Sequence, residues 1–504
     1  MLKRNTVANF AGQGWAALMS LAFVPLYIQY LGIEAYGVIG LFVMLQAWLV
    51  LLDLGMTPTI NREMARFTAG QHTSQEIRDL LRSLEIVAGT IAVIVALAIA
   101  GSAPLIANGW VKIDTLDPQT VTQAVAVMGL VMATRLLESL YRSSLIGLQR
   151  QVLYNVVFAV TATLRGGGVV IVLVFWSSTL EAFFLWQAMA SLVSLAVLSV
   201  VTYATLPKGE RRAHFSVPAL RGIGRFAGGM VLITLLSLLL MQADKLLLST
   251  LLPLDEFGRY ALATAVAGGL TAISVPIAQA WFPRMSQLHA AGDFGELGNA
   301  FHKGAQLISI ATGSAAIFLM AFAEQLLWIW TGDAQLASSV APLLSLLALG
   351  NLLHAMNWIP YYTQLAFGWT RLAIYINIAA VLVIVPAILV ITPRYGAIGA
   401  ACIWVALNVF YVLLGAQIMF RKILKGELQR WYTRDLAFPL AGAGLAALLL
   451  QRIVPFADDV ALTFVGLVFA AFATVAAASV AAPDLTVPVL KGMWEKVATR
   501  VGER

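Results

Sequence analysis

Long apolar stretches of about 20 residues recur along the whole chain and are separated by short polar segments. A helix needs about 20 mostly apolar residues to cross a bilayer, whereas a membrane β-strand alternates over about 10 residues, and no such alternation is visible. The pattern predicts an all-α polytopic membrane protein with about 14 transmembrane helices. The predicted spans cover residues 9–30, 37–58, 83–107, 120–141, 152–176, 182–205, 226–251, 258–281, 305–326, 337–367, 372–392, 397–420, 435–451 and 461–482.

Basic residues are distributed unevenly over the segments between these spans. With the N-terminus inside, the inner segments hold 25 of the 32 Lys and Arg residues, and the outer loops hold only Lys112, Arg259, Arg394 and Arg452. Inner loops of membrane proteins are enriched in Lys and Arg, so this distribution predicts that both termini are cytoplasmic. The first apolar run is too long for the core of a signal peptide, and we expect the first span to stay in the protein.

Composition agrees with a membrane protein. The 504 residues are 60% hydrophobic and 11% charged, with a mean hydropathy of +0.85. A soluble protein carries about 25% charged residues, so soluble enzymes, nucleic-acid-binding proteins and disordered proteins are excluded. The net charge of +7 follows from the basic inner segments. The single cysteine, Cys402, excludes a disulfide framework or a cysteine metal site within one chain.

Short motifs recur at a shift of 221 residues. Glu34-Ala35-Tyr36-Gly37 precedes the second span, and Asp255-Glu256-Phe257-Gly258 precedes the eighth. At the same shift, Gly147, Arg150 and Tyr154 recur as Gly368, Arg371 and Tyr375. Each copy has six spans, an even number, so both copies start on the same side and form parallel repeats around a central cavity.

The repeat predicts the organisation of the chain. We expect a first six-helix bundle at 1–206, a cytoplasmic linker at 207–225, and a second six-helix bundle at 226–420. Two additional transmembrane helices follow at 421–483, and a cytoplasmic amphipathic tail at 484–504. Residues Thr73 to Arg82, with Thr73 and Glu76 as a capping box, are predicted to form a similar short helix on the inner membrane surface.

Charged residues inside the spans are costly and usually face a protein interior or a wet cavity. Arg135, Glu138 and Arg142 share one helical face, which suits either a self-neutralised ladder or a cationic wall whose charge one carboxylate sets. Arg165 precedes three glycines and has no carboxylate one turn away, which favours anion binding.

The remaining polar residues inside the spans leave two interpretations open. Asp244 and Lys245 are adjacent and point about 100° apart, so each needs a partner on another helix or a ligand. Helix–helix hydrogen bonds or a hydrated cavity would explain the uncharged polar stripes. The predicted lining residues are Asn9, Gln13, Gln46, Asn351, His354 and Asn357.

Signatures of enzymes are missing from the sequence. There is no phosphate-binding glycine loop followed by Lys-Ser/Thr, and no histidine–carboxylate cluster has the spacing of a metal site. The outer loops are too short for a catalytic domain. We therefore expect a protein that is not an enzyme and that needs no metal or cofactor.

Scattered positions in the first half and at the seventh span resemble one family. These positions are Arg4-Asn5-Thr6, Phe10-Ala11-Gly12, Pro25-Leu26-Tyr27, Tyr30-Leu31-Gly32, Tyr36-Gly37, Leu52-Asp53-Leu54-Gly55, Asn61-Arg62-Glu63, Gln242-Ala243-Asp244-Lys245 and Phe257-Gly258-Arg259-Tyr260. Over the first twelve spans the chain resembles the polysaccharide-biosynthesis transporters, which include O-antigen flippases. This family belongs to the multidrug/oligosaccharidyl-lipid/polysaccharide exporter (MOP) superfamily.

The resemblance implies a flippase of the bacterial cytoplasmic (inner) membrane. Its substrate would be an undecaprenyl-diphosphate-linked oligosaccharide, such as a repeat unit of O-antigen, capsule or exopolysaccharide, moved outward by alternating access. Arg135, Arg165 and Lys245 would bind the diphosphate in a cationic cavity. One of Asp53, Glu138 and Asp244 would couple transport to H⁺ or Na⁺. Expected partners are a polysaccharide polymerase and glycosyltransferases.

Other functions stay open at this point. A cation-coupled multidrug exporter of the same superfamily would favour an acidic cavity, so the basic residues inside the spans count against it. The extra pair of spans is similar to that of lipid II flippases. A membrane-embedded glycan-processing enzyme is disfavoured by the short outer loops.

Overall fold

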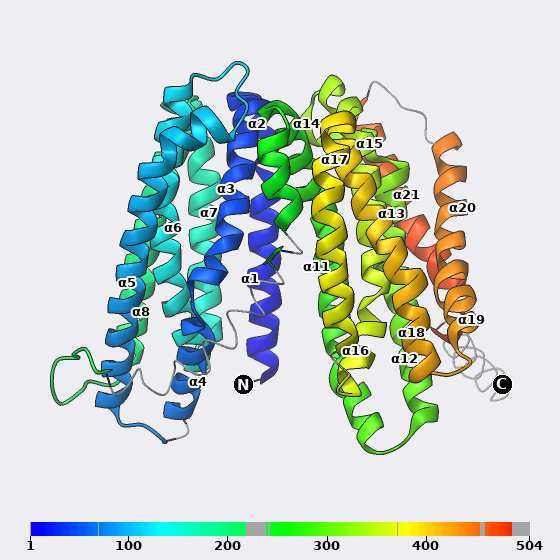
Figure 1. Ribbon diagram of the computed structural model, residues 1–504, viewed down its shortest axis with the longest axis horizontal. Coiled ribbons are helices and arrows are strands. Elements are labelled where there is room, and N and C mark those ends of the chain that lie inside the picture. Colours follow the sequence, from blue (N-terminus) through cyan, green and yellow to red (C-terminus); the bar gives the residue numbers. More distant parts are fainter. Residues whose placement is uncertain are drawn as a thin grey trace, which may run out of the picture. The chain divides into compact units, whose positions relative to one another are not determined.

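The structure, a computed structural model, describes residues 2–68, 70–217, 238–239, 242–369, 371–453 and 459–485, with the side chains of residues 2–10, 373 and 453 outside the description. The described residues form helices and no strand; Lys112 and Pro253 make an isolated parallel β-bridge. The predicted all-α class is confirmed (Figure 1).

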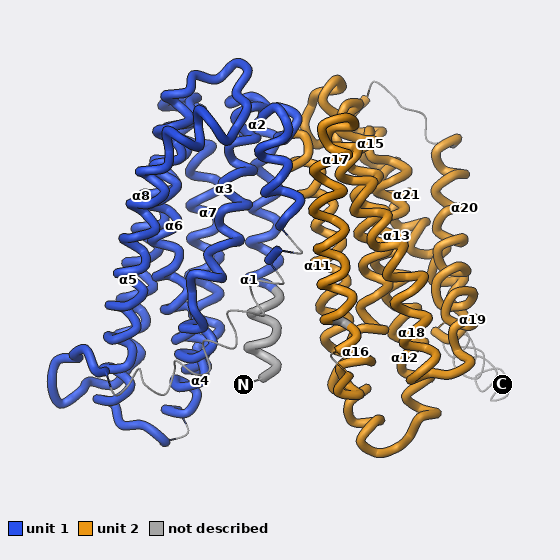
Figure 2. The backbone as a smooth tube through the Cα atoms, viewed as in Figure 1, with its two compact units in different colours: residues 1–258 blue, residues 259–504 orange. Residues whose placement is uncertain are grey.

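The chain divides into two compact units, Met1–Gly258 and Arg259–Arg504 (Figure 2). The division falls within helix α11, Leu254–Ala290, so that helical residues 242–251 and the first turn of α11 belong to unit 1. The predicted boundaries at 206 and 225 stay a prediction.

Unit 1 is arranged around α6, which packs against α3, α4, α5, α7 and α8, while α1 packs against α7. One apolar cluster of unit 1 lies where α4, α5 and α6 meet. The helices are α1 Leu2–Ala22, α2 Val24–Leu31, α3 Ile33–Leu52, α4 Met56–Thr68, α5 Ser74–Leu105 with the π-helical turn η1 Ile106–Trp110, α6 Pro118–Gly147, α7 Gln151–Phe175 and α8 Leu180–Thr205.

Unit 2 has α15 packed against α13, α14 and α17, and the last two helices, α20 and α21, pack against each other and against α13. After α11, its helices are α12 Phe294–Ile308, η2 Ser309–Gly313, α13 Ser314–Ala321, α14 Ala323–Thr331, α15 Ala334–Met356, α16 Trp358–Ala366, α17 Arg371–Phe410, η3 Tyr411–Gly415, α18 Ala416–Lys422, α19 Leu428–Arg430, η4 Trp431–Ala437, α20 Phe438–Ile453 and α21 Val460–Val480.

Among the described residues, 12 helices are long and apolar enough to cross a membrane. One of them, Ile374–Lys422, would be about 70 Å long if straight, more than twice the hydrocarbon thickness. It bends at Gly396, where φ is 59° and ψ is −150°, into two limbs that match predicted spans 372–392 and 397–420. Predicted span 226–251 lies largely outside the described residues. The count of 14 and the inner position of both termini stay predictions.

The capping box at Thr73 is confirmed, but the short surface helix is not. The Glu76 N–H donates to Thr73 Oγ1 at 3.2 Å, and the Thr73 N–H donates to the Glu76 carboxylate at 2.8 Å. The helix that begins there is α5, which continues for 32 residues into the third span. The prediction was wrong because the chain stays helical through the charged turn between the two apolar segments, where Arg82 and Glu85 also pair at 3.1 Å. The tail after residue 485 lies outside the described residues.

Three successive glycines in α7, Gly166 to Gly168, let aromatic rings approach the helix. A Cβ at Gly166 would lie 2.7 Å from the Phe23 ring, and a Cβ at Gly168 would lie 2.3 Å from the Trp186 ring. The glycines therefore serve close packing within a continuous helix.

We expect Gly168→Ala to destabilise unit 1, because its methyl group would overlap the Trp186 ring. Overpacking of this kind costs about 1–3 kcal/mol. Gly167→Ala is the matched control, since the nearest atom would lie at an ordinary 3.6 Å. Thermal unfolding of the purified proteins in detergent should show a lower Tm for Gly168→Ala only. Equal Tm values would contradict the packing role.

Candidate functional site

An ion pair joins α6 to α7 in the interior of unit 1. Arg165 donates from Nη2 to both carboxylate oxygens of Glu138 at 2.6 and 2.7 Å. The two side chains are only 15% and 12% exposed. Glu138 thus pairs with Arg165 of α7 rather than with an arginine of its own helix α6. Arg165 has no carboxylate nearby in α7, and its partner carboxylate comes from α6.

Arg135, one turn before Glu138 on α6, binds a neutral group. Its Nη1 donates to Gln46 Oε1 of α3 at 2.5 Å, and its guanidinium lies 5.6 Å from the centre of the Phe42 ring. Arg135 also interacts electrostatically with Arg165 and Glu138. The arrangement favours the cationic-wall interpretation over the self-neutralised ladder: two guanidinium groups share the surroundings of one carboxylate.

Both arginines retain hydrogen-bonding capacity. The Nε atoms of Arg135 and Arg165 are buried and have no hydrogen-bond partner among the described residues. A buried N–H donor without an acceptor is costly, and an anionic oxygen is the acceptor that a guanidinium binds most strongly. The surplus positive charge and the two unpaired donors suit an anionic ligand.

Asp53 lies at the turn between α3 and α4. Leu54 and Gly55 have φ values of 48° and 75°, which break the helix. The Asp53 carboxylate accepts hydrogen bonds from the Thr57 N–H, at 3.1 and 3.2 Å, and from the Thr57 hydroxyl, which lies 3.4 Å from Ser139 Oγ of α6. Asp53 therefore caps the first turn of α4. Its role in ion coupling stays a prediction.

Asp244 and Lys245 contact each other, contrary to the sequence-based expectation that they are not a local pair. Lys245 Nζ lies 3.3 Å from the Asp244 carboxylate, and the side chains are 27% and 22% exposed. The flexible lysine stem reaches around the helix, which an argument from the directions of the Cβ atoms overlooks.

In unit 2, the polar stripe of α15 forms hydrogen bonds between helices. Asn351 donates to the Ala267 carbonyl of α11 at 2.8 Å and accepts from Trp404 Nε1 of α17 at 2.9 Å. His354 Nδ1 lies 3.0 Å from Asn408 Oδ1, also in α17. These contacts favour helix packing as the role of Asn351 and His354.

The other predicted lining residues are dispersed. Asn357 donates to the Leu353 carbonyl of its own helix at 2.8 Å. Gln13 is exposed on α1, and the Asn9 side chain lies outside the described residues. Of the predicted lining residues, Gln46 contacts Arg135, which is a predicted substrate-binding residue.

Sequence reasoning missed a buried network in unit 2, where α12 meets η4. His302 is 0% exposed; its Nδ1 lies 2.5 Å from Asp435 and its Nε2 3.1 Å from Glu427. Gln306, one turn later on α12, donates to Asp435 and to Asp484, each at 2.9 Å. The network fastens α12 to η4 and to the segment after α21. The four-residue spacing of His302 and Gln306 was the available signal, but it falls at the edge of a predicted span.

We expect Asp435→Ala to loosen the C-terminal helices from unit 2, because it removes the carboxylate that the buried His302 and Gln306 side chains bind, and each buried donor left without an acceptor costs about 1–3 kcal/mol. Hydrogen exchange should become faster in residues 428–485, with unit 1 unchanged. Glu324→Ala, which removes an exposed carboxylate in α14, is the control. Unchanged exchange in Asp435→Ala would refute a fastening role.

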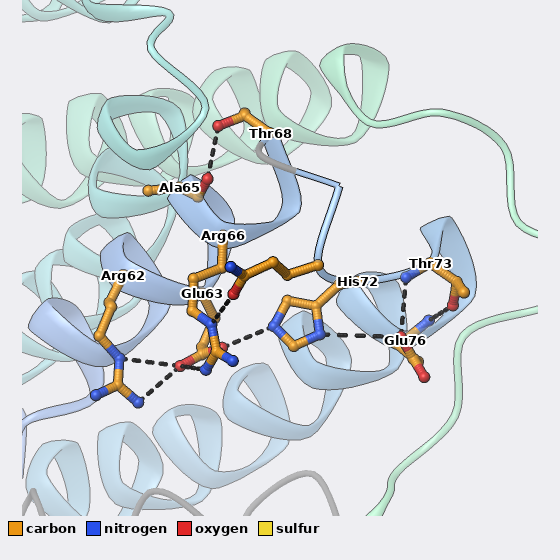
Figure 3. Close-up of polar contacts among 9 residues, drawn as sticks. Arg62, Glu63, Ala65, Arg66, Thr68, His72, Thr73 and Glu76 are labelled. Atoms are coloured by element: carbon orange, nitrogen blue, oxygen red, sulfur yellow. Dashed lines mark hydrogen bonds and ion pairs between the residues drawn. The ribbon is translucent and has the colours of Figure 1, made fainter.

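Where α4 meets the start of α5 in unit 1, three basic side chains surround Glu63 of α4 (Figure 3). Arg62, Arg66 and His72 approach its carboxylate to 2.8, 3.1 and 2.7 Å, and Glu63 is 7% exposed. Burial alone would raise the pKa of Glu63, but hydrogen bonds from Arg62 and His72 and the charge of Arg66 outweigh it, so that the pKa lies below its usual value.

Because the pKa of Glu63 is lower in the folded protein, its ionised carboxylate stabilises the fold. This contribution is fully present above the ordinary pKa of about 4.3, and it is lost as the pH falls through the lowered pKa. Glu63→Gln should therefore lower Tm at pH 7, and the difference from the unmodified protein should close below about pH 4. The control, Glu324→Gln, should change Tm little at any pH. A constant difference for Glu63→Gln across this range would show that its charge is not responsible.

Known proteins share both the sequence and the fold. The chain matches the family model of the polysaccharide biosynthesis proteins over residues 2–289 and that of the MatE family over residues 230–390. It is 22% identical over 414 residues to the "Putative O-antigen transporter" of Shigella flexneri, covering 82% of this chain and 96% of that protein.

Two solved structures show the same architecture. The lipid II flippase MurJ in its inward closed conformation has a TM-score of 0.68 at 10% identity, covering 96% of this chain and 99% of MurJ. An inward-facing multidrug resistance MATE family transporter of the MOP superfamily has a TM-score of 0.64 at 15% identity, covering 84% and 96%. At these identities the likeness concerns the fold.

The relatives are transporters and flippases rather than enzymes, and the chain is a multi-pass membrane protein, which in a bacterium resides in the inner membrane. Since the first family model covers more than half of the chain, the protein belongs to the polysaccharide biosynthesis protein family and is a membrane transporter of the MOP superfamily.

Proposed function

We propose that the protein is a flippase that moves undecaprenyl-diphosphate-linked oligosaccharide from the inner to the outer leaflet by alternating access. The observation that carries the proposal is the pair Arg135 and Arg165, which share one carboxylate and keep two buried, unpaired Nε donors. A diphosphate offers several anionic oxygens, and planar guanidinium groups bind such oxygens in pairs. The polyprenyl tail would stay in the lipid while the head group crosses.

The ion pair suggests how an ion is coupled to this movement. A phosphate that binds Arg165 competes with Glu138 for the same Nη2 donor. The released carboxylate lies in a region of low dielectric, where its charge is unfavourable unless a proton or sodium ion neutralises it. We therefore assign the coupling role to Glu138 ahead of Asp53, which caps α4, and Asp244, which contacts Lys245.

The proposal predicts that Arg135→Gln reduces export at least about 10-fold while leaving folding intact, because the partner that remains is the neutral amide of Gln46. A hydrogen bond to a charged group contributes about 1.5–3 kcal/mol. Export is measured in vesicles loaded with undecaprenyl-diphosphate-linked oligosaccharide, by the accessibility of the head group to a reagent that cannot cross the membrane. Arg421→Gln, at an exposed position of α18, is the control.

A matched pair of variants separates charge from stability at Arg165. Arg165→Gln alone would leave Glu138 buried and unpaired, which is destabilising by itself. The double variant Arg165→Gln/Glu138→Gln removes both charges, so the protein should accumulate normally yet fail to export. Normal export by both Arg135→Gln and the double variant would reject the diphosphate site.

The same vesicle assay decides between this substrate and its alternatives. Lipid II carries the same undecaprenyl diphosphate. Export of lipid II alone would therefore support the diphosphate-binding site but show that the transported glycan is a different one. Export of a small organic cation, with no effect on either lipid, would reject the flippase proposal. On our proposal, glycosyltransferases on the inner side supply the substrate and a polymerase on the outer side consumes it.

A further inference from the structure

An aromatic cluster lies where α15 ends and α16 begins in unit 2. Trp358 opens α16, and Tyr361 and Tyr362 follow three and four residues later, so the three side chains share one face of the helix. The rings of Trp358 and Tyr362 are nearly parallel, with their centres 6.0 Å apart and an angle of 25° between their planes. The Tyr361 ring crosses both at steep angles, with its centre 6.1 and 5.5 Å from theirs. All three side chains are partly exposed, so part of this aromatic surface is open.

The polar atoms of the cluster lack partners within the described part of the chain. Trp358 Nε1 is buried and has no hydrogen-bond partner there. The hydroxyl groups of Tyr361 and Tyr362 form no hydrogen bond with another described residue. Tryptophan and tyrosine side chains usually find a partner when buried, and a buried donor without an acceptor is costly. The three groups are therefore available to a ligand that offers hydroxyl groups.

The sequence repeat explains why the Tyr362 hydroxyl group is free. Its counterpart 221 residues earlier is Tyr141, which donates to Glu85 at 2.9 Å. The counterpart of Glu85 is Gln306, whose side-chain amide donates to Asp435 of η4 at 2.9 Å. In the second copy, the residue that corresponds to the partner of the tyrosine is thus engaged in the network that fastens the C-terminal helices.

Packing of the helix does not by itself require the other two rings. The counterparts of Trp358 and Tyr361 in the first copy are Leu137 and Leu140, which belong to the apolar cluster of α4, α5 and α6. Between the two leucines, α6 carries Glu138 of the proposed diphosphate site. The same stretch of the repeat therefore holds charged groups in the first copy and neutral aromatic groups in the second.

Anchoring at the membrane interface is the second role open to tryptophan and tyrosine in a membrane protein. An anchoring ring directs its polar atom to water or to the lipid head groups. Trp358 Nε1 is instead buried, and the rings of Trp358 and Tyr362 pack against the apolar core of unit 2. The three rings also contact one another on one short helix. These contacts favour ligand binding over anchoring.

We propose that Trp358, Tyr361 and Tyr362 form a sugar-binding platform, which holds a pyranose ring of the oligosaccharide head group. A pyranose ring has an apolar face of C–H groups that stacks on aromatic rings, and hydroxyl groups around its edge that donate and accept hydrogen bonds. Ligand sites combine aromatic walls with a few polar groups, and the platform supplies both. The assignment rests on the proposed function, because it takes the glycan of that substrate as the ligand.

The first test uses sugars without a lipid. Saturation-transfer NMR on the purified full-length protein, in a detergent without a sugar head group, should show transfer to the C–H groups of methyl glycosides of glucose, galactose or N-acetylglucosamine. Trp358→Leu/Tyr361→Leu should reduce this transfer several-fold. The double variant introduces the residues of the first copy, Leu137 and Leu140, so we expect it to fold. Tyr375→Leu, at a position of α17 that is 67% exposed, is the control and should leave the transfer unchanged.

The second test separates the sugar from the diphosphate. Binding of undecaprenyl diphosphate and of undecaprenyl-diphosphate-linked N-acetylglucosamine is measured with the protein in lipid nanodiscs. Trp358→Leu/Tyr361→Leu should weaken binding of the sugar-bearing lipid several-fold and leave binding of the sugar-free lipid unchanged, because only the former reaches the platform. Arg135→Gln should weaken binding of both lipids, because both carry the diphosphate.

The outcomes separate the platform from the proposed function. No saturation transfer from the unmodified protein, or equal transfer from the double variant, would overturn the platform. Equal weakening of both lipids by the double variant would identify the two rings as membrane anchors and would also overturn it. Saturation transfer that depends on the two rings, with no binding of either lipid, would support the platform and count against the proposed substrate.

A second variant keeps the platform testable if the leucine variant fails to fold. Tyr361→Phe/Tyr362→Phe retains both rings and removes the two hydroxyl groups. It should still weaken binding of the sugar-bearing lipid and leave the sugar-free lipid unaffected. Unchanged binding of both lipids would show that the hydroxyl groups do not bind the sugar and would reject the platform.

Discussion

The hydrocarbon region admits a charge only where the protein supplies a partner, and this constraint governs the interior of both units. In unit 1, Arg165 forms an ion pair with Glu138 of another helix, and Arg135 donates a hydrogen bond to the side-chain amide of Gln46. These partners come from α3, α6 and α7, so the charges also specify which helices are neighbours. A cationic cluster that fixes the packing of three helices can bind an anion without a large rearrangement.

The two units satisfy this constraint in different ways. In unit 2 the polar groups of α12 and α15 are joined to acceptors and donors of other segments, as in the pairs His302–Asp435 and His354–Asn408. In unit 1 the Nε donors of Arg135 and Arg165 remain unpaired within the described part of the chain. The residues 221 positions after Arg135 and Arg165 are Met356 and Pro386, so the sequence of the second copy does not repeat this cationic cluster, and we place the anion-binding chemistry in the first copy. The second copy carries the network that fastens the last two helices.

Close approach of backbones is the second physical theme. Helices in a bilayer gain little from burying apolar side chains against each other, so small residues that permit tight contact become important. Gly168 accepts the ring of Trp186, and Gly37 and Gly258 accept each other's helices. The first contact is between helices of one bundle, and the second joins equivalent parts of two repeats.

The sequence by itself determined the membrane class, the positions of most helices, the capping box at Thr73 and the repeat, because each depends on spacing within a continuous segment. It also singled out Arg135, Glu138 and Arg165. Only the tertiary structure decided that Glu138 pairs with Arg165, that Asp435 holds His302, and that Gly37 meets Gly258. Helical periodicity shows which side chains share a face of one helix, but the partner on another helix depends on how the helices pack, and the pattern along the chain does not contain that information.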